Sequence, residues 1–233
     1  MFSISIEYSN QVSEPDEEYG EGDGFIDDVK GDIYLTYQDC DDFYSKKDRE
    51  LIASINETLI LAHKEDGPDK VLIGNASWSY VYANDAARFG YSCMDICSVH
   101  SQDFSEIYWA LHDEDHSPKD SVFEAIGQEI FYINDFATID ELSILPKFRR
   151  RGFGLEAIDI ICRRIINGAS IVVIQPAPLQ FTRLGKDETY AQKMGYSDLE
   201  QDEKKATKKL FNYYKKVGFK RLKNTKYMLR GLD

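Results

Sequence analysis

Hydrophobic and polar residues alternate along several short stretches of the chain, as they do in β-strands with one buried face. The alternation is clearest in residues 2–8 and 32–38, and residues 70–83 add a run rich in β-branched and aromatic side chains. Residues 170–178 contain a continuous apolar run, as in a strand buried on both faces of a parallel sheet. Further strands are expected at residues 129–135, 139–145, 219–222 and 226–230. We expect the first two of these four to form a hairpin through a short polar connection.

Other stretches place apolar residues at helical spacing. Ser45 with Asp48, and Ser197 with Glu200, have the spacing of capping boxes, and Ser101 stands where an N-cap would. The apolar side of the helix after Ser101 predicts a core face and consists of Phe104, Ile107, Tyr108 and Leu111. The predicted helices span residues 46–63, 102–111, 155–166 and 198–217, and Gly218 ends the last one.

The order of these elements predicts an α+β fold, with a central mixed sheet flanked by helices and one strand–helix–strand crossover. A chain of 233 residues with 42% hydrophobic content is long enough to bury one substantial core. No internal repeat or linker divides it. We therefore expect a single domain over residues 1–233, with an acidic N-terminal extension over residues 1–45.

Composition narrows the class of protein. No apolar run approaches the roughly 18 residues of a membrane span, and the first twenty residues lack the basic and apolar regions of a signal peptide. The four cysteines show no CxxC spacing. These features predict a soluble, cytoplasmic protein with reduced thiols and no membrane partner.

Charge is distributed unevenly along the chain. The formal net charge of -13 makes nucleic acid an unlikely partner, because nucleic-acid-binding proteins usually carry a basic face. Residues 1–50 are rich in Asp and Glu, whereas residues 204–230 contain eleven Lys or Arg and no acidic residue. The acidic part is either solvated surface or a face that attracts a cationic partner.

The sequence of one predicted turn indicates an anion-binding site. Residues 149–154, Arg-Arg-Arg-Gly-Phe-Gly, lie between a predicted strand and a predicted helix, where unpaired backbone N–H groups and the helix dipole favour a phosphate. The alternative is a plain basic turn. Residues 152–157 also satisfy a variant of the dinucleotide fingerprint, but the next strand ends without the acidic residue that would bind a ribose. No Walker lysine follows the glycines either.

The same turn carries a resemblance to a known family. A strand followed by Pro146, then R-x-x-G-x-G from Arg149 to Gly154 and an apolar helix, resembles motif A of the GNAT-type N-acetyltransferases. Residues 214–219 match the family's Y-x-x-x-G-F pattern at the end of a late helix. The resemblance covers residues 129–230 and points to an uncharacterised branch of the family. This sequence departs from the family's common pattern in two places: Leu210 stands where alanine is usual before the tyrosine, and residues 182–203 form a charged insert.

The resemblance implies a GNAT-like fold that binds acetyl-CoA as acetyl donor. The pyrophosphate would lie on the turn, and the pantetheine arm beside the strand that ends before Pro146. The implied cofactor-binding residues are Ile144, Leu145, Arg149, Arg150, Arg151, Gly152, Phe153, Gly154 and Leu155. Tyr214 would be the acid that protonates the leaving thiolate, since a phenol stays protonated at neutral pH. The alternative for Tyr214 is a packed core tyrosine.

A base is also needed to deprotonate the amine. Glu141 lies on the strand that should flank the thioester, and we expect it to be the catalytic base. Asp140 points the other way if the strand is regular, and His112 and Glu106 remain alternatives. The expected activity is transfer of an acetyl group to a primary amine of a small molecule or protein, with a cationic acceptor favoured and a homodimer left open. The alternatives are an enzyme acting on aminoacyl-tRNA and a non-catalytic module that binds CoA or another protein.

Overall fold

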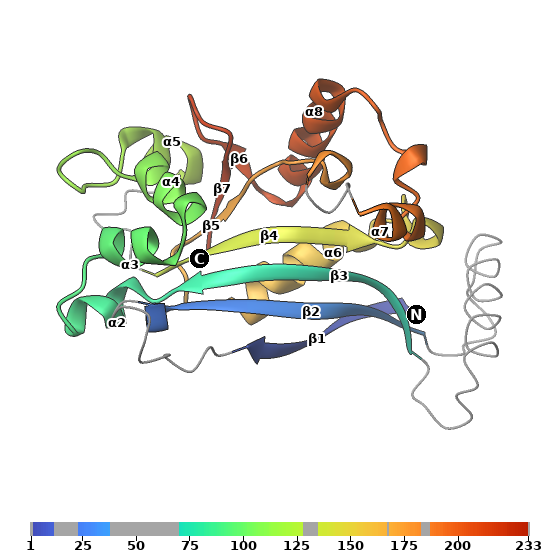
Figure 1. Cartoon of the computed structure of the whole chain (residues 1–233), viewed down its shortest axis with the longest axis horizontal. Helices are drawn as coiled ribbons and strands as arrows, with labels where there is room; N and C mark the ends of the chain where they lie inside the picture. The colour runs from blue at the N-terminus through green and yellow to red at the C-terminus, as the bar shows by residue number, and fades with distance from the viewer. Residues whose placement is uncertain are drawn as a thin grey trace.

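The computed structural model describes residues 2–11, 23–37, 70–127, 135–166, 168–182 and 187–232 (Figure 1). The helix predicted over residues 46–63, with its capping box, lies outside these ranges. So do residues 12–22 and 38–45 of the acidic extension and all but the last residue of the strand predicted at residues 129–135. None of the helices in the described ranges has the length and apolar composition needed to cross a bilayer.

Seven strands of the described chain form one sheet in the order β1-β2-β3-β4-β5-β7-β6. All neighbouring strands are antiparallel except β4 and β5, which are parallel and joined by the crossover that contains α6. The bounds are β1 Phe2–Gln11, β2 Ile26–Tyr37, β3 Lys70–Val81, β4 Phe136–Ile144, β5 Ile171–Ile174, β6 Lys220–Arg221 and β7 Met228–Gly231. This arrangement confirms the predicted α+β fold with a mixed sheet.

The helices gather at three places around the sheet (Figure 1). Helices α2 (Ala83–Arg88), α3 (Cys93–His100), α4 (Gln102–Leu111) and α5 (Asp120–Ile126) lie together at one end. Helix α6 (Phe153–Ile160) crosses one face and continues into a π-helical turn, η3 (Ile161–Ile165). Helices α7 (Glu188–Lys193) and α8 (Glu203–Tyr214) lie at the other end. The 3-10 turns are η1 Asp23–Phe25, η2 Pro146–Phe148, η4 Leu179–Phe181, η6 Tyr196–Asp198 and η7 Lys215–Val217.

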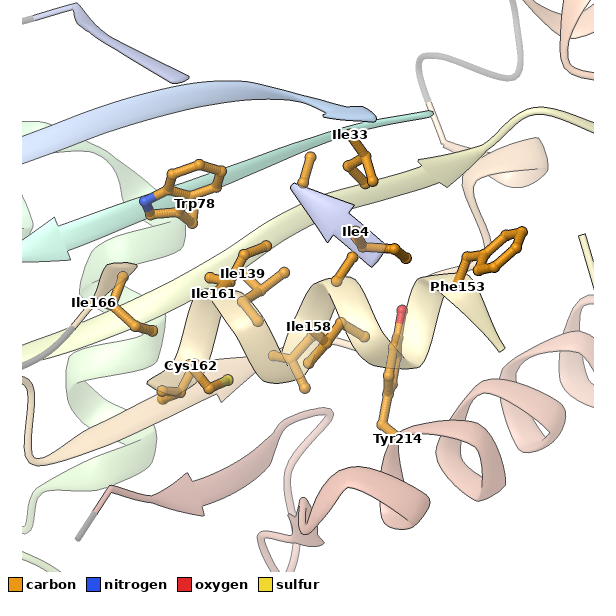
Figure 2. Close-up of a cluster of buried hydrophobic side chains, with 14 of the residues drawn as sticks. Ile4, Ile33, Trp78, Ile139, Phe153, Ile158, Ile161, Cys162, Ile166 and Tyr214 are labelled. Carbon is orange, nitrogen blue, oxygen red and sulfur yellow. The ribbon is translucent and has the colours of Figure 1, made fainter. Parts of the chain in front are cut away.

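The two faces of the sheet carry separate apolar cores. Figure 2 shows the core on the α6 face, where Ile158 of α6 and Ile161 of η3 lie in one cluster with the sheet residues Ile139 and Trp78. The core on the opposite face packs α2–α5 against the sheet, and its helix α4 contributes Phe104, Ile107, Tyr108 and Leu111 as predicted. The predicted N-cap of α4 is also confirmed, because the Ser101 hydroxyl accepts a hydrogen bond from the Phe104 amide.

The predicted start of the last long helix and the predicted hairpin before Pro146 are wrong. Helix α8 begins at Glu203 with Asp202 as its N-cap, because Ser197 is taken up in η6 and Glu200 forms an ion pair with Lys209 instead of closing a capping box. The supposed connection at residues 136–138 is part of β4, and the strands beside β4 are β3 and β5. Phe136 is completely buried, which extended structure satisfies and a polar connection would not.

Candidate functional site

Strands β4 and β5 separate halfway along β4. They pair only between Phe136–Ile139 and Ile171–Ile174, and β4 then continues alone on that side to Ile144. The chain after β5 contains Pro176 and Pro178, which have no backbone N–H to continue the ladder. Residues 140–144 therefore have one backbone edge with which no strand of the described chain pairs.

A cavity of about 240 Å³, here called the edge cavity, lies beside this unpaired edge. Its walls come from β4, from the chain after β5, from the segment at residues 194–200 and from α8. Most of its lining is apolar, and the polar side chains on it include Asp140, Glu141, Arg149, Tyr196 and Tyr214. An extended, largely apolar molecule that carries a few polar groups fits such a lining.

A β-bulge shapes the floor of the edge cavity. Ile139 pairs with Trp78 and Glu141 pairs with Ser77, so Asp140 is an extra residue on β4. Ile139 and Leu142 both pack on the α6 face, which leaves Asp140 and Glu141 together on the opposite face. In a regular strand Asp140 would point away from Glu141, as expected from the sequence. The bulge breaks that regularity, so the expectation is wrong.

A second, more polar cavity of about 380 Å³, here called the face cavity, lies between the sheet and helices α3 and α4. It is lined by side chains that include Asp28, His100, Asp103, Phe104 and Tyr227. Ile139, Asp140 and Gln175 line both cavities. Both cavities therefore border the place where β4 and β5 separate, and Asp140 is one of the residues between them.

Asp140 lies in a hydrogen-bonded chain of side chains. Thr138 Oγ1 donates to Asp140 Oδ1 over 2.6 Å, and Ser79 Oγ lies 2.8 Å from Asp140 Oδ2 and 2.6 Å from Asp28 Oδ1. His100 Nε2 approaches the other oxygen of Asp28 at 3.5 Å. Because the Ser79 hydroxyl has a single hydrogen, both of its contacts can be hydrogen bonds only when one of the two carboxylates carries a proton.

The same surroundings shift the pKa of Asp140. Desolvation raises this pKa from 3.8 to about 6, and the negative charges of Asp28 and Glu141 add to the rise, while the bonds from Thr138 and Ser79 oppose it. The side chain remains in contact with solvent through the cavities although protein atoms surround it on most sides. A carboxylate of this kind can accept and release a proton near neutral pH.

The other candidate bases are placed differently. Glu141 lines the edge cavity, and burial raises the pKa of its carboxyl while Lys30 opposes the rise. His112 is buried against Tyr108, with its Nδ1 3.0 Å from the Tyr108 carbonyl oxygen, and Glu106 is exposed in an ion pair with Lys226. Neither His112 nor Glu106 lines the edge cavity or the face cavity.

The Arg-Gly turn precedes α6 directly. Gly152 is the N-cap in the left-handed region at φ 90°, and its carbonyl accepts the Leu155 and Glu156 amides. Within the described ranges, the backbone N–H groups of residues 150–154 have no acceptor. The side chains of Arg150 and Arg151 are exposed, and Arg150 also adopts a left-handed φ of 62°. Amides and cations at one helix N-terminus can bind an anion.

Arg149 is placed apart from the other two arginines. It lines the edge cavity and donates from Nε to the Ile144 carbonyl over 2.8 Å and from Nη2 to the Met194 carbonyl over 2.6 Å. The guanidinium therefore joins the end of β4 to the segment after α7. Part of its hydrogen-bonding capacity is used for this structural contact.

The two tyrosines at the end of α8 point to different surroundings. The Tyr213 hydroxyl would lie 2.5 Å from a Cβ added at Gly154, so a larger residue at this position would require Tyr213 to move. Tyr214 is only 8% exposed, reaches toward α6 (Figure 2) and lines the edge cavity. Burial raises the pKa of Tyr214, with a smaller contribution from Tyr213, so its hydroxyl keeps its proton at neutral pH.

Of the residues predicted for the site, Glu141, Ile144, Arg149 and Tyr214 line the edge cavity. Leu145 follows β4, and residues 150–155 form the adjoining turn and helix start. Sequence reasoning placed Asp140 on the face away from Glu141, because a bulge leaves no mark in the alternation of a mixed polar run. It also missed Asp28, Ser79 and Tyr196, which reach the two cavities from distant parts of the chain.

Comparisons with known proteins found no relative: no family model, no curated protein and no solved structure matches the chain.

Proposed function

We propose that the chain is an acetyl-CoA-dependent N-acetyltransferase of the GNAT type, acting on a primary amine of a small molecule or protein. The observation that carries the proposal is the position of Asp140 between the two cavities. One cavity suits an extended donor and the other a polar acceptor, so a donor and an acceptor bound in them would meet beside a carboxylate whose pKa is about 6.

In this proposal the edge cavity holds the acetyl donor. The unpaired edge of β4 offers backbone N–H and C=O groups to the amides of a pantetheine arm, in the way that a peptide adds to a sheet edge. The free amides of residues 150–154, with Arg150 and Arg151, would receive the diphosphate. The resemblance noted in the sequence and the position of the turn at the end of β4 agree on this placement.

The face cavity would hold the amine. Asp140 takes a proton from the ammonium group of the acceptor, and the neutral nitrogen attacks the thioester carbonyl. The carbon–sulfur bond then breaks, and the Tyr214 hydroxyl protonates the departing thiolate. The second proton that the nitrogen loses as the amide forms replaces the one that Tyr214 gives up. Glu141 was the base expected from the sequence, but the position of Asp140 between the cavities and its raised pKa favour Asp140.

The test is to incubate the purified protein with acetyl-CoA and a panel of primary amines and to measure release of free CoA thiol. We expect release that depends on the amine, together with CoA binding by calorimetry. Arg151→Ala should weaken CoA binding roughly three- to tenfold, because it removes an exposed cation beside the turn. Arg164→Ala removes the same charge from an exposed position beyond α6 and should leave the affinity unchanged.

The alternatives give different results in the same assay. CoA binding without turnover of any amine would favour a non-catalytic CoA-binding module. Steeply salt-dependent binding of tRNA would favour an enzyme acting on aminoacyl-tRNA, through exposed α8 lysines such as Lys204 and Lys208. Absence of CoA binding by the wild-type protein would overturn the proposal.

A further inference from the structure

One buried polar group in the edge cavity has no well-formed hydrogen bond within the part of the chain that the structure describes. Tyr196 is 6% exposed and lines this cavity, and its hydroxyl makes no hydrogen bond of good geometry with any described residue, although the Ser143 and Tyr190 hydroxyls lie close enough to influence its pKa. Buried hydroxyl groups in native proteins are nearly always paired, since an unpaired one loses its hydrogen bonds to water without replacement. A phenylalanine in the same place would fill the same space without that loss.

The surrounding polar groups are paired with each other instead. The Ser143 and Tyr190 hydroxyls lie 3.1 Å apart and hydrogen-bond to one another. Tyr190 packs edge-on against Tyr196 with ring centroids 6.0 Å apart, but it does not line the edge cavity. Burial is the main cause that raises the pKa of Tyr196, so its phenol remains a hydrogen-bond donor at neutral pH.

Hydrogen bonds from two side chains hold the backbone around Tyr196 in place. Arg149 binds the Met194 carbonyl, and Gln201 Nε2 donates to the Tyr196 carbonyl over 2.9 Å. Gly195, between them, turns the chain at φ 54° against Pro146. These hydrogen bonds join the turn to the end of β4 and to Gln201. The backbone is therefore held in place, and its movement does not bring the phenol to another hydrogen-bond partner.

We propose that the Tyr196 hydroxyl binds an amide carbonyl oxygen in the arm of the acyl donor. This inference rests on the proposed function, because it takes the edge cavity to be the donor site. The ligand it needs is an extended, mostly apolar molecule with a hydrogen-bond acceptor, and the amide carbonyls of a pantetheine arm beside β4 meet that need. Tyr196 is thus a positioning residue that orders the arm, separate from the anion site at the Arg-Gly turn.

The experiment compares two ligands by calorimetry, CoA and adenosine 3′,5′-bisphosphate, which lacks the arm. Tyr196→Phe should weaken CoA binding roughly five- to tenfold, the scale of one hydrogen bond. It should leave bisphosphate binding within about twofold, and the ligand-free variant should melt at a temperature no lower than wild type. Tyr190→Phe is the matched control, since it removes a neighbouring phenol that lies outside the cavity, and it should keep wild-type affinity for both ligands.

The outcomes separate this inference from the proposed function. Failure of the wild-type protein to bind CoA would overturn both. Wild-type CoA binding with no loss in Tyr196→Phe, or an equal loss for CoA and the bisphosphate, would overturn only the role of Tyr196. A selective loss of CoA affinity in Tyr190→Phe as well would assign the effect to packing of the turn and overturn the assignment to the Tyr196 hydroxyl.

Discussion

The Ser79 hydroxyl lies between two carboxylates, those of Asp28 and Asp140, and can donate its hydrogen to only one at a time. The network is therefore complete when the pair holds one proton, which agrees with the raised pKa of Asp140. An ammonium group that enters the face cavity would supply positive charge to the same pair. Binding of an amine and release of the proton are then coupled events at one position.

The pKa of Asp140 gives a prediction for activity. Because the base must be ionised to accept a proton, kcat/KM should fall as the pH drops below about 6. In Asp140→Asn, kcat should fall by on the order of 10² or more, and this acidic limb should disappear from any residual activity. The measurement is a pH–rate profile from pH 5 to 9, and Glu141→Gln is the matched control. If Glu141→Gln shows the larger loss, Glu141 is the base.

The same pKa gives a separate prediction for stability. A carboxyl whose pKa rises from 3.8 unfolded to about 6 folded binds its proton more tightly in the folded state, so the stabilisation from that proton is present below pH 3.8 and is lost as the pH rises through 6. Asp140→Asn should therefore melt at a higher temperature than wild type at pH 8. The difference should shrink at pH 4, as thermal unfolding at the two pH values will show. A variant less stable at pH 8 would contradict the raised pKa.

Tyr214→Phe tests the acid. The change removes one hydroxyl and keeps the ring packed in the α6-face core, so kcat should fall by on the order of 10² with little change in the KM for acetyl-CoA. Tyr213→Phe is the neighbouring comparison, and since the Tyr213 hydroxyl lies beside the start of α6 it should affect the KM more than kcat. Normal turnover in Tyr214→Phe would make this residue a packed core tyrosine.

At the scale of elements, the end of β4 is held to the segment after α7 by the Arg149 guanidinium. Arg149→Ala breaks two charge-assisted bonds to backbone carbonyls and should lower the free energy of unfolding by about 2 kcal/mol. Amide hydrogen exchange should speed up most at residues 188–199. Arg88→Ala, which breaks only an exposed ion pair with Asp85, should change stability by less than about 0.5 kcal/mol. Equal exchange in both variants would contradict the role of Arg149.

The sequence predicted elements well where one local signal dominates. The Ser101 cap with its apolar helix face and the continuous apolar run of β5 are examples, because the hydrogen bonds and burial that form them are encoded within a few residues. The start of α8 was missed because Ser197 and Asp202 both suit an N-cap, and the contact of Glu200 with Lys209, nine residues away, favours the later start.

The site was predicted only in part for the same reason. Tyr214 and the Arg-Gly turn carry local motifs, and both lie at or next to the edge cavity. The role of Asp140 depends on a bulge, which forms through pairing of β4 with β3, and the face cavity depends on Asp28 and His100, brought together from positions far apart in the chain. Pairing between distant segments has no signature in a single sequence.

At the scale of the whole molecule, net charge bears on how the two substrates bind. The chain carries a formal charge of -13, and acidic side chains line the face cavity, whereas the cations of the Arg-Gly turn are local. Raising ionic strength should therefore raise the KM for a cationic amine more than the KM for acetyl-CoA. Steady-state kinetics between about 50 and 300 mM salt will measure both.

Asp103 offers a matched variant for this effect. It is exposed at the rim of the face cavity, so Asp103→Asn should reduce the salt dependence of the amine KM without changing kcat. Equal salt effects on both substrates in the wild-type protein would argue against a cationic acceptor.

The bulge in β4 also bears on how such a site could have arisen. If Asp140 were removed from the chain, Ile139, Leu142 and Ile144 would still face the α6 core, with Glu141 and Ser143 on the other side, in the plain alternation of an unbroken strand. A single-codon insertion into an ancestral strand could therefore add a carboxylate between the two cavities without exchanging one core position. Asp140, the residue proposed to act on the substrate, is thus not needed for the alternation of buried and exposed residues along β4.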